Sequence, residues 1–402
     1  MHPLPRRTFL AGASTALAIP RIARAASPVK IGVLSDASSA YADLSGTGSL
    51  HAAQMAIEDF GGKLLGSPIE TVFADHQNKV DVGTGIARQW YDQEGVDLIV
   101  DVLNSAIALG LQKIAAEKGR VFMFGATASD LNGKSCSPNG FQWGMDSYVL
   151  THGLANGVVA DGGDSWYFIS SDYLAGQAAE QEFRKALAER NVPVLGASKF
   201  PLNNADFSPF LLAAQASRAK VIAATTGGSD TINLVKQAME FHIAQGGQKL
   251  VLTSYFPTDT HALGLQAAQG IRYTSSFFWD LDDDTRAFTK RYIERAGKIP
   301  TWNQADVYSA TTHYLRAVAQ AGSKDTASVL PAIRQTPVND LTTRNGAIRD
   351  DGQVARDIYF LEVKAPSASS GPWDYESLVA TIPPGQAYRP LAQSECPLAR
   401  HI

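Results

Sequence analysis

The chain has 402 residues, of which 45% are hydrophobic, and its 35 Lys and Arg against 39 Asp and Glu leave a formal net charge of -4. This length exceeds the roughly 250 to 300 residues at which a single core usually divides, which predicts two lobes. The slightly acidic balance argues against nucleic acid or an anionic membrane as partner, and beyond residue 25 no run approaches the roughly 18 apolar residues that a membrane helix needs.

The first 25 residues have the layout of an export signal of the twin-arginine type. Arg6 and Arg7 precede an apolar run over residues 11–19, and Ala23-Arg24-Ala25 follows as a small-x-small cleavage site. The alternative is a basic N-terminus on a cytosolic enzyme. We expect cleavage after Ala25 and a soluble periplasmic protein with 31 basic and 39 acidic residues. The signal has no cysteine at its end, which argues against a lipid anchor there.

Strand-like apolar runs alternate with helical patterns through the first third of the chain. The expected strands are 29–35, 70–75, 97–103 and 121–124, and the expected helices are 50–60, 82–93 and 106–118. Strands that alternate with helices in this way predict a parallel sheet covered on both faces.

The same unit is repeated after residue 148. Strands are expected over 166–170, 221–225 and 250–254, helices over 175–189 and 231–241, and an extended segment over 271–279. Three helical patterns follow at 283–296, 303–321 and 326–334, and the Ser-, Gly- and Pro-rich segment 366–372 is expected to lead into an irregular tail. The fold class is therefore α/β, with two lobes built on parallel sheets.

Cys136 and Cys396 are the two cysteines of the chain. In an exported protein a disulfide between them is expected, because disulfides persist outside the cytoplasm. Two separate buried thiols are the alternative. A disulfide would hold the C-terminal tail against the chain near residue 136.

Ligands of open α/β sheets bind beyond the carboxyl ends of the strands. The loops at these positions are 36–49, 104–105, 125–129, 172–176, 227–230 and 255–259. They are rich in Ser, Thr, Gly and Tyr, and the chain has no G-x-S-x-G motif, no P-loop and no His pair with metal-ligand spacing. We therefore expect a binding protein without catalytic residues, cofactor or metal.

Four segments, in order, carry a resemblance to a known family. They are KIGVLSDASSAYADLSG, DLIVDVLNSAIALGLQKIAAEKGRVFMFGATASDL, FPLNNADFSPFLLAAQASRAKVIAATTGGSD and NQADVYSATTHYLRAVAQAG. Over essentially the whole mature chain, the sequence resembles type I periplasmic solute-binding proteins of ABC importers, of the branched-chain amino-acid (Leu/Ile/Val) class. The resemblance implies a monomer whose partners are a small-molecule ligand and an ABC permease of the inner membrane.

The resemblance also implies two Rossmann-like lobes joined by a hinge of three crossings, which closes on the ligand. Residues 28–145 and about 278–340 are expected in lobe 1, and residues 146–277 and about 341–365 in lobe 2. Residues 366–402 are expected to form the irregular tail.

In the first lobe, the resemblance places the ligand's carboxylate on Ser105, assisted by Asn104, and adds the Gly125 backbone and Thr127. Helix N-terminal amides and hydroxyls satisfy an anion without a buried counter-charge. The alternative for Ser105 is a purely structural role as N-cap of the helix that begins at Ala106.

The second lobe is expected to cover the ligand with Tyr173, opposite Tyr41 of the first lobe, although either tyrosine could belong to the core. The loops that hold Ser229 and Asp230, and Tyr255 and Phe256, are expected to close over the remainder of the ligand.

One departure from the family's pattern changes the expected ligand. Amino-acid binders of this family place a glutamate, which pairs with the ligand's ammonium, after the strand that is here 250–254; this chain has Tyr255-Phe256-Pro257 instead. A buried ammonium without a carboxylate costs several kcal/mol. We therefore expect an acid with an apolar or aromatic body, unless Asp230 substitutes. The alternatives are the same clamp binding an amino acid or amide, or a ligand sensor for a signalling partner.

Overall fold

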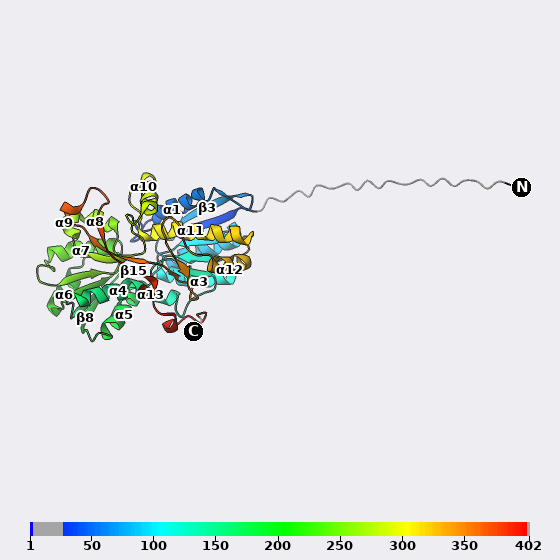
Figure 1. Ribbon diagram of the computed structural model, residues 1–402. Coiled ribbons are helices and arrows are strands. Elements are labelled where there is room, and N and C mark those ends of the chain that lie inside the picture. Colours follow the sequence, from blue (N-terminus) through cyan, green and yellow to red (C-terminus); the bar gives the residue numbers. More distant parts are fainter. Residues whose placement is uncertain (3–26, 400–402) are drawn as a thin grey trace.

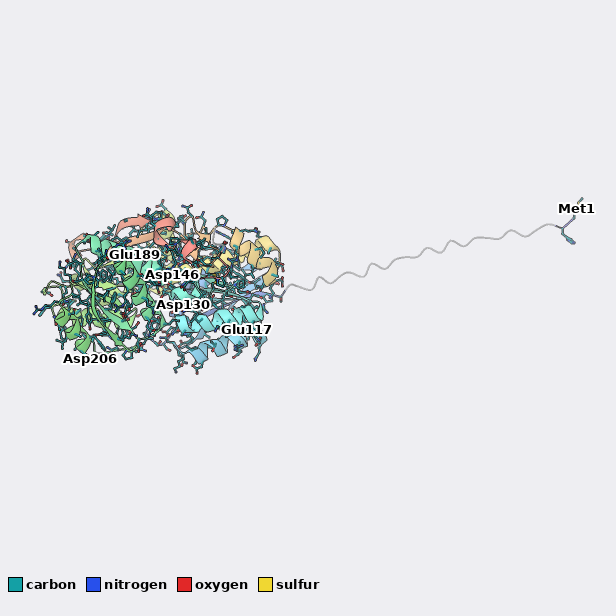
Figure 2. All side chains as sticks on the ribbon, turned by 90° about the horizontal axis from the view of Figure 1, so that it is seen from below. Met1, Glu117, Asp130, Asp146, Glu189 and Asp206 are labelled. Carbon is teal, nitrogen blue, oxygen red and sulfur yellow. A yellow bond between two sulfur atoms is a disulfide. The ribbon has the colours of Figure 1, made fainter. Side chains whose placement is uncertain are left out.

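The computed structural model describes residues 1–2 and 27–399, and it contains two α/β lobes that lie side by side (Figure 1). Figure 2 separates them clearly, with Glu117 on one lobe, Asp206 at the far end of the other, and Asp130 and Asp146 between them. The expected export signal lies outside the described residues except for its first two. No helix in the described part of the chain has the length and apolar character needed to span a bilayer.

A six-stranded sheet forms the centre of the first lobe, in the order β2-β3-β1-β4-β5-β6. Neighbouring strands run parallel except β2 and β3, which form a hairpin. The strands are β1 (Val29–Ser35), β2 (Lys63–Leu64), β3 (Ser67–Asp75), β4 (Leu98–Asp101), β5 (Val121–Phe124) and β6 (Gly140–Gln142). Every residue of β4 and β5 is buried, as expected for central strands of a sheet covered on both faces.

Helices from two distant parts of the sequence cover this sheet. They are α1 (Gly46–Asp59), α2 (Val80–Gln89), α3 (Ser105–Lys118), α10 (Asp283–Ala296), α11 (Trp302–Ala321) and α12 (Thr326–Gln335). A π-helical turn, Trp90–Glu94, continues α2. The long helix α11 packs against α1 and β4, and its first seventeen residues are buried except for Arg316, so it fills the first lobe's core.

A four-stranded parallel sheet, in the order β10-β9-β7-β8, forms the second lobe. Its strands are β7 (Trp166–Ser171), β8 (Val194–Phe200), β9 (Val221–Thr225) and β10 (Lys249–Leu252). Its helices are α4 (Ser147–Ala160), α5 (Leu174–Ala188), α6 (Ser208–Ser217), α7 (Ser229–Glu240), α8 (Pro257–Leu263) and α9 (Leu265–Ala268). The parallel α/β architecture predicted from the sequence is confirmed, whereas β6, α4, β8 and α6 were not anticipated.

An antiparallel sheet flanks the second lobe and corrects the expectation of an irregular tail. It consists of β11 (Arg272–Ser275), β14 (Ile358–Val363) and β15 (Glu376–Ile382), followed by the short helix α13 (Pro384–Ala387). The prediction was wrong over β15 because most of this edge strand is exposed, and an exposed edge needs no apolar alternation.

The chain also leaves the first lobe later than expected. Residues 341–356 pack on the first lobe, whereas the second lobe was expected from about residue 341. Thr342 donates a hydrogen bond to the Ala305 carbonyl of α11 at 3.2 Å, and Val354 belongs to the first lobe's core. The small hairpin of β12 (Ala347–Ile348) and β13 (Val354–Ala355) lies in this segment.

Three chain segments pass between the lobes, at residues 143–146, 276–282 and 356–357. The guanidinium of Arg356 forms a buried ion pair with Asp306 of α11 and donates to the Trp143 carbonyl at 2.8 Å. The Ser276 hydroxyl donates to the same Asp306 carboxylate at 3.4 Å. One ion pair thus contacts all three crossings.

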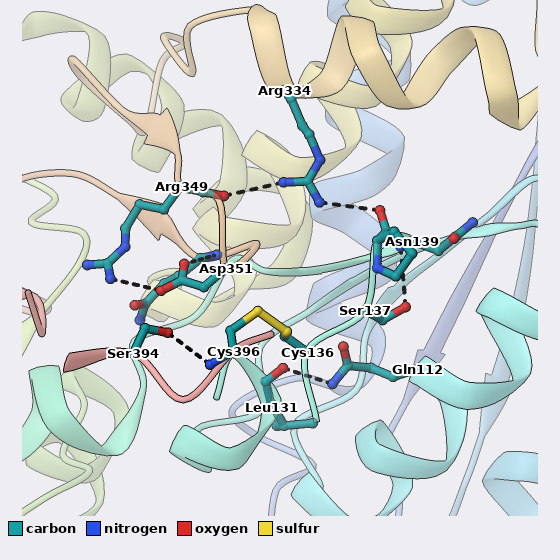
Figure 3. The surroundings of a disulfide bond; sticks show 12 residues. Gln112, Leu131, Cys136, Ser137, Asn139, Arg334, Arg349, Asp351, Ser394 and Cys396 are labelled. Atoms are coloured by element: carbon teal, nitrogen blue, oxygen red, sulfur yellow. Dashed lines mark hydrogen bonds and ion pairs between the residues drawn. A yellow bond between two sulfur atoms is a disulfide. The ribbon is translucent and has the colours of Figure 1, made fainter. Parts of the chain in front are cut away.

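A disulfide joins Cys136 to Cys396, with the Cα atoms 5.6 Å apart, and it confirms the predicted pairing (Figure 3). Before it, the tail returns from β15 to the first lobe, where Ala387 and Tyr388 enter the core. Arg389 pairs with Glu182 of α5 at 2.8 Å. The tail therefore links the lobes a fourth time.

Glu376 at the start of β15 makes stability depend on pH. Its side chain is 2% exposed, and burial raises the pKa of the carboxyl to about 8. The folded protein therefore holds a proton that the unfolded chain releases near pH 4.5, so the free energy of unfolding falls as the pH rises through this window, by up to about 1.4 kcal/mol per pH unit.

We predict that Glu376→Gln flattens the pH dependence of stability between pH 5 and 8 and makes the protein more stable at pH 8. Urea unfolding at several pH values measures this. Glu240→Gln, at the exposed end of α7, is the control and should keep the wild-type profile. A Glu376→Gln profile parallel to that of the wild type would contradict the prediction.

Candidate functional site

A cavity that is partly open to solvent lies between the two lobes. It is bounded by residues that follow the strand ends of both sheets, as expected for open α/β sheets. The lining residues are Tyr41, Leu44, Leu103, Thr127, Leu150, Ser171, Tyr173, Ala175, Gly176, Ala179, Thr225, Thr226, Gly227, Thr253, Ser254, Phe256 and Trp302.

The lining is neutral and combines hydroxyl-bearing and apolar side chains. Within the described residues, no charged side chain belongs to it. Five hydroxyl residues come from the strand ends of the second lobe: Ser171, Thr225, Thr226, Thr253 and Ser254. The first lobe contributes the apolar side chains of Leu44, Leu103 and Trp302 and the hydroxyls of Tyr41 and Thr127. Among the described residues, no group of three His, Cys, Asp or Glu side chains is placed to hold a metal ion.

A stacked pair of aromatic side chains forms one wall of the cavity. Phe256, at the N-terminus of α8, stacks on Trp302, which begins α11, with ring centroids 5.7 Å apart and an interplanar angle of 23°. Stacked rings present a flat apolar surface, which suits an aromatic or branched aliphatic body.

Tyr41 and Tyr173 meet across the cleft. The Tyr41 hydroxyl donates to the Tyr173 hydroxyl at 2.9 Å. The Asp36 carboxylate, just after β1, accepts hydrogen bonds from the amides of Ser39 and Tyr41, both at 3.0 Å, and so fixes the loop that presents Tyr41. Tyr173 stands just before α5. The direct contact between the lobes identifies this arrangement as closed.

Burial keeps both phenols protonated at neutral pH. It raises the pKa of Tyr41 well above its usual value and the pKa of Tyr173 to about 12. Since the Tyr173 oxygen accepts from Tyr41, the Tyr173 proton is available to another acceptor.

A second contact across the cleft involves backbone alone. The Ser229 amide lies 3.4 Å from the Ala40 carbonyl. Gly228 has φ +66°, and a Cβ atom placed on it would lie 2.2 Å from the Ala40 oxygen. Only glycine permits both this conformation and this approach without strain.

Of the first-lobe residues expected in the site, Tyr41 and Thr127 line the cavity, and Asn104, Ser105 and Gly125 do not. The Asn104 side chain caps α3 by accepting from the amides of Ala106 and Ile107, at 2.9 and 3.0 Å. The Ser105 hydroxyl is buried and accepts from the Ala128 amide at 3.3 Å. Gly125 packs against Asn303, where a Cβ atom would lie 2.0 Å from Asn303 Oδ1.

Of the expected second-lobe residues, Tyr173 and Phe256 line the cavity, and Ser229, Asp230 and Tyr255 do not. The Asp230 carboxylate accepts from the amides of Asn203 and Asn204, at 3.0 and 2.8 Å. Tyr255 is directed into the second lobe's core, where its ring packs against Tyr273 with centroids 5.2 Å apart.

Sequence reasoning missed several lining residues. Thr225 ends the strand predicted over 221–225 and Thr226 follows it, so their position at a strand end was a usable signal. Leu150 and Trp302 lie at the starts of α4 and α11, and nothing in their local sequence indicates that these helices begin at the cleft.

Comparisons with known proteins agree with this fold. The sequence model of a family described as periplasmic binding protein matches residues 28–371. The chain is 24% identical to the Leu/Ile/Val-binding protein homolog 6 of Brucella melitensis, over 87% of this chain and 92% of that protein.

Solved structures are similar over nearly the whole chain. A periplasmic binding protein from Burkholderia mallei has a TM-score of 0.90 and 41% identity, covering 93% of this chain and 99% of the other. A branched chain amino acid ABC transporter periplasmic ligand-binding protein from Burkholderia xenovorans has a TM-score of 0.83 and 40% identity, covering 92% and 100%. A Rhodopseudomonas palustris solute binding protein in complex with 4-hydroxybenzoate, 18% identical with a TM-score of 0.80 and covering 89% and 98%, shares the fold.

Gly176, in the first turn of α5, lets this helix approach the strand ends that line the cavity. A Cβ atom on it would lie 2.2 Å from Ser171 Oγ and 2.5 Å from the Ser171 carbonyl oxygen. We predict that Gly176→Ala destabilises the protein by about 1 to 3 kcal/mol, because the clash outweighs the gain in helix propensity.

Gly157→Ala in α4 is the matched control, because its Cβ atom would have its nearest contact at 3.9 Å, from Phe360. This variant should be as stable as the wild type or more so. Urea unfolding of both variants tests the close approach, and a Gly176→Ala protein as stable as Gly157→Ala would disprove it.

Proposed function

Because this chain belongs to the periplasmic binding protein family, we propose that it captures a small carboxylic acid with an apolar or aromatic body and delivers it to a permease. At the coarser level, the protein is the periplasmic substrate-binding component of an ABC transporter. We further propose that residues 1–25 direct its export. Its action is capture and release, which requires no covalent chemistry.

The neutral lining of the cavity is the observation that supports the proposed class of ligand. A zwitterionic amino acid would bring an ammonium into a space that, among the described residues, no carboxylate lines. An unpaired buried ammonium is unfavourable by several kcal/mol. A carboxylate differs, because hydroxyls and helix N-terminal amides are donors that satisfy it without a cation.

Asp230 does not replace the missing carboxylate. Both of its oxygens accept hydrogen bonds from backbone amides of the 203–204 turn, and its side chain is not part of the cavity lining. Turning it toward a ligand would leave those two amides without an acceptor.

The apolar half of the cavity fits the rest of such an acid. Leu44, Leu103 and the stacked pair of Phe256 and Trp302 enclose a flat apolar volume. The 4-hydroxybenzoate complex of the Rhodopseudomonas palustris protein gives an example of this fold holding an aromatic acid.

We predict that acids without an ammonium stabilise the protein and that the matching amino acids do not. The panel pairs 3-phenylpropanoate with L-phenylalanine and 4-methylpentanoate with L-leucine, and adds benzoate and 4-hydroxybenzoate. A bound acid at 100 times its dissociation constant adds about 2.7 kcal/mol of stability, which a thermal-shift assay detects. If only the amino acids raise the unfolding temperature, the proposed ligand class is wrong.

We also predict that Gly228→Ala weakens binding of the best acid of this panel at least tenfold, because its Cβ atom would meet the Ala40 oxygen and hold the cleft open. Gly247→Ala is the control, since Gly247 also has a positive φ but open space around its Cβ position. Small-angle scattering should show ligand-induced compaction for the control and not for Gly228→Ala. Equal compaction in both would contradict the role of this contact in closure.

A further inference from the structure

The N-terminus of α5 reaches the cavity without a cap. Its N-cap residue, Tyr173, does not cap the helix with its side chain, which instead bonds with Tyr41 across the cleft. The first backbone bond of the helix is from Gln177 to the Tyr173 carbonyl. In the described part of the chain, no acceptor is found for the amides of Leu174, Ala175 and Gly176. Ala175 and Gly176 line the cavity.

The corresponding helix of the first lobe is different. Asn104 caps α3 and takes up the amides of Ala106 and Ile107, and Ser105 is engaged with Ala128. At the helix N-terminus where the family resemblance placed the carboxylate, the amides of Ala106 and Ile107 are therefore already satisfied from within the protein.

Two hydroxyls at the end of β9 provide an independent sign of a ligand. Thr225 and Thr226 line the cavity and are 1% and 7% exposed, yet neither hydroxyl has a hydrogen-bond partner within the described residues. Buried hydroxyls are normally paired, and an unpaired one is costly.

The backbone of Thr225, which carries one of these hydroxyls, lies next to the α5 N-terminus. The Ser171 hydroxyl donates to the Thr225 carbonyl at 2.9 Å, and a Cβ atom on Gly176 would lie 3.0 Å from the same oxygen. Ala175, Gly176, Thr225 and Thr226 all line the cavity, where the positive end of the helix dipole adds to the attraction of amides and hydroxyls for an anion.

We propose that the acid group of the ligand binds to the second lobe, on the amides of Ala175 and Gly176 and the hydroxyls of Thr225 and Thr226, and not on Ser105 of the first lobe. This inference rests on the proposed function. The apolar body then lies toward Leu103 and Trp302, so that the second lobe holds the charge and the first lobe holds the hydrocarbon. The Tyr173 hydroxyl is a further donor, because its proton is not used in the hydrogen bond with Tyr41.

Thr225→Val and Thr226→Val test the assignment, because valine keeps the shape of threonine and removes the hydroxyl. Calorimetric titration uses the tightest-binding of the four acids of the panel. Loss of one hydrogen bond to a charged group should weaken binding about ten- to a hundredfold for each variant. Because neither hydroxyl has a protein partner, both variants should unfold in the absence of ligand at or above the wild-type temperature.

First-lobe variants provide the controls. Ser105→Ala should keep wild-type affinity, and Thr127→Val, the same change in the opposite wall, should weaken binding less than Thr226→Val does. If Ser105→Ala or Thr127→Val abolishes acid binding while both second-lobe variants bind as the wild type does, the acid site is wrong and the proposed function stands. If the wild type binds amino acids and none of the four acids, the proposed function fails, and the acid site fails with it.

Discussion

The buried ion pair between Arg356 and Asp306 is the interaction on which the two-lobed arrangement depends. It contacts Trp143 in the first crossing and Ser276 in the second, and Arg356 itself lies in the third. Two charges buried this deeply stabilise a structure only as a pair, since loss of either partner leaves an uncompensated charge and costs about 3 to 5 kcal/mol. The pair therefore fixes where the crossings meet, and with them the position of one set of strand ends relative to the other.

Closure of the cleft relies on small side chains and neutral donors. Gly228 allows the α7 N-terminus to reach the Ala40 carbonyl, and Gly176 allows α5 to approach the ends of β7 and β9. The tyrosine pair then bridges the lobes, with both phenols kept protonated by burial. Among the described residues, no charged side chain lines the resulting cavity. It therefore offers hydrogen-bond donors to an anion but no carboxylate to a cation.

The C-terminal tail adds a connection that a hinge of three crossings does not have. After β15 in the sheet that flanks the second lobe, the chain enters the first lobe's core at Tyr388, pairs with Glu182 of α5 through Arg389, and ends in the disulfide to Cys136 (Figure 3). A covalent link that closes so long a loop restricts the unfolded chain strongly. In the folded protein, the same segment ties the middle of the second lobe's α5 to the first lobe.

The sequence alone determined the α/β class, the repeated unit and the loops that carry the site, because the period of the apolar residues and the order of strands and helices are local properties. It also proposed Tyr41, Thr127, Tyr173 and Phe256, which line the cavity, as site residues, and it paired Cys136 with Cys396. Only the tertiary structure decided which strand-end groups remain unsatisfied. Ser105 and Asp230 bond to backbone amides brought to them by folding, whereas Thr225, Thr226 and the α5 amides are left facing the cavity. Hydrogen-bond saturation depends on neighbours distant in sequence, so local pattern cannot reveal it.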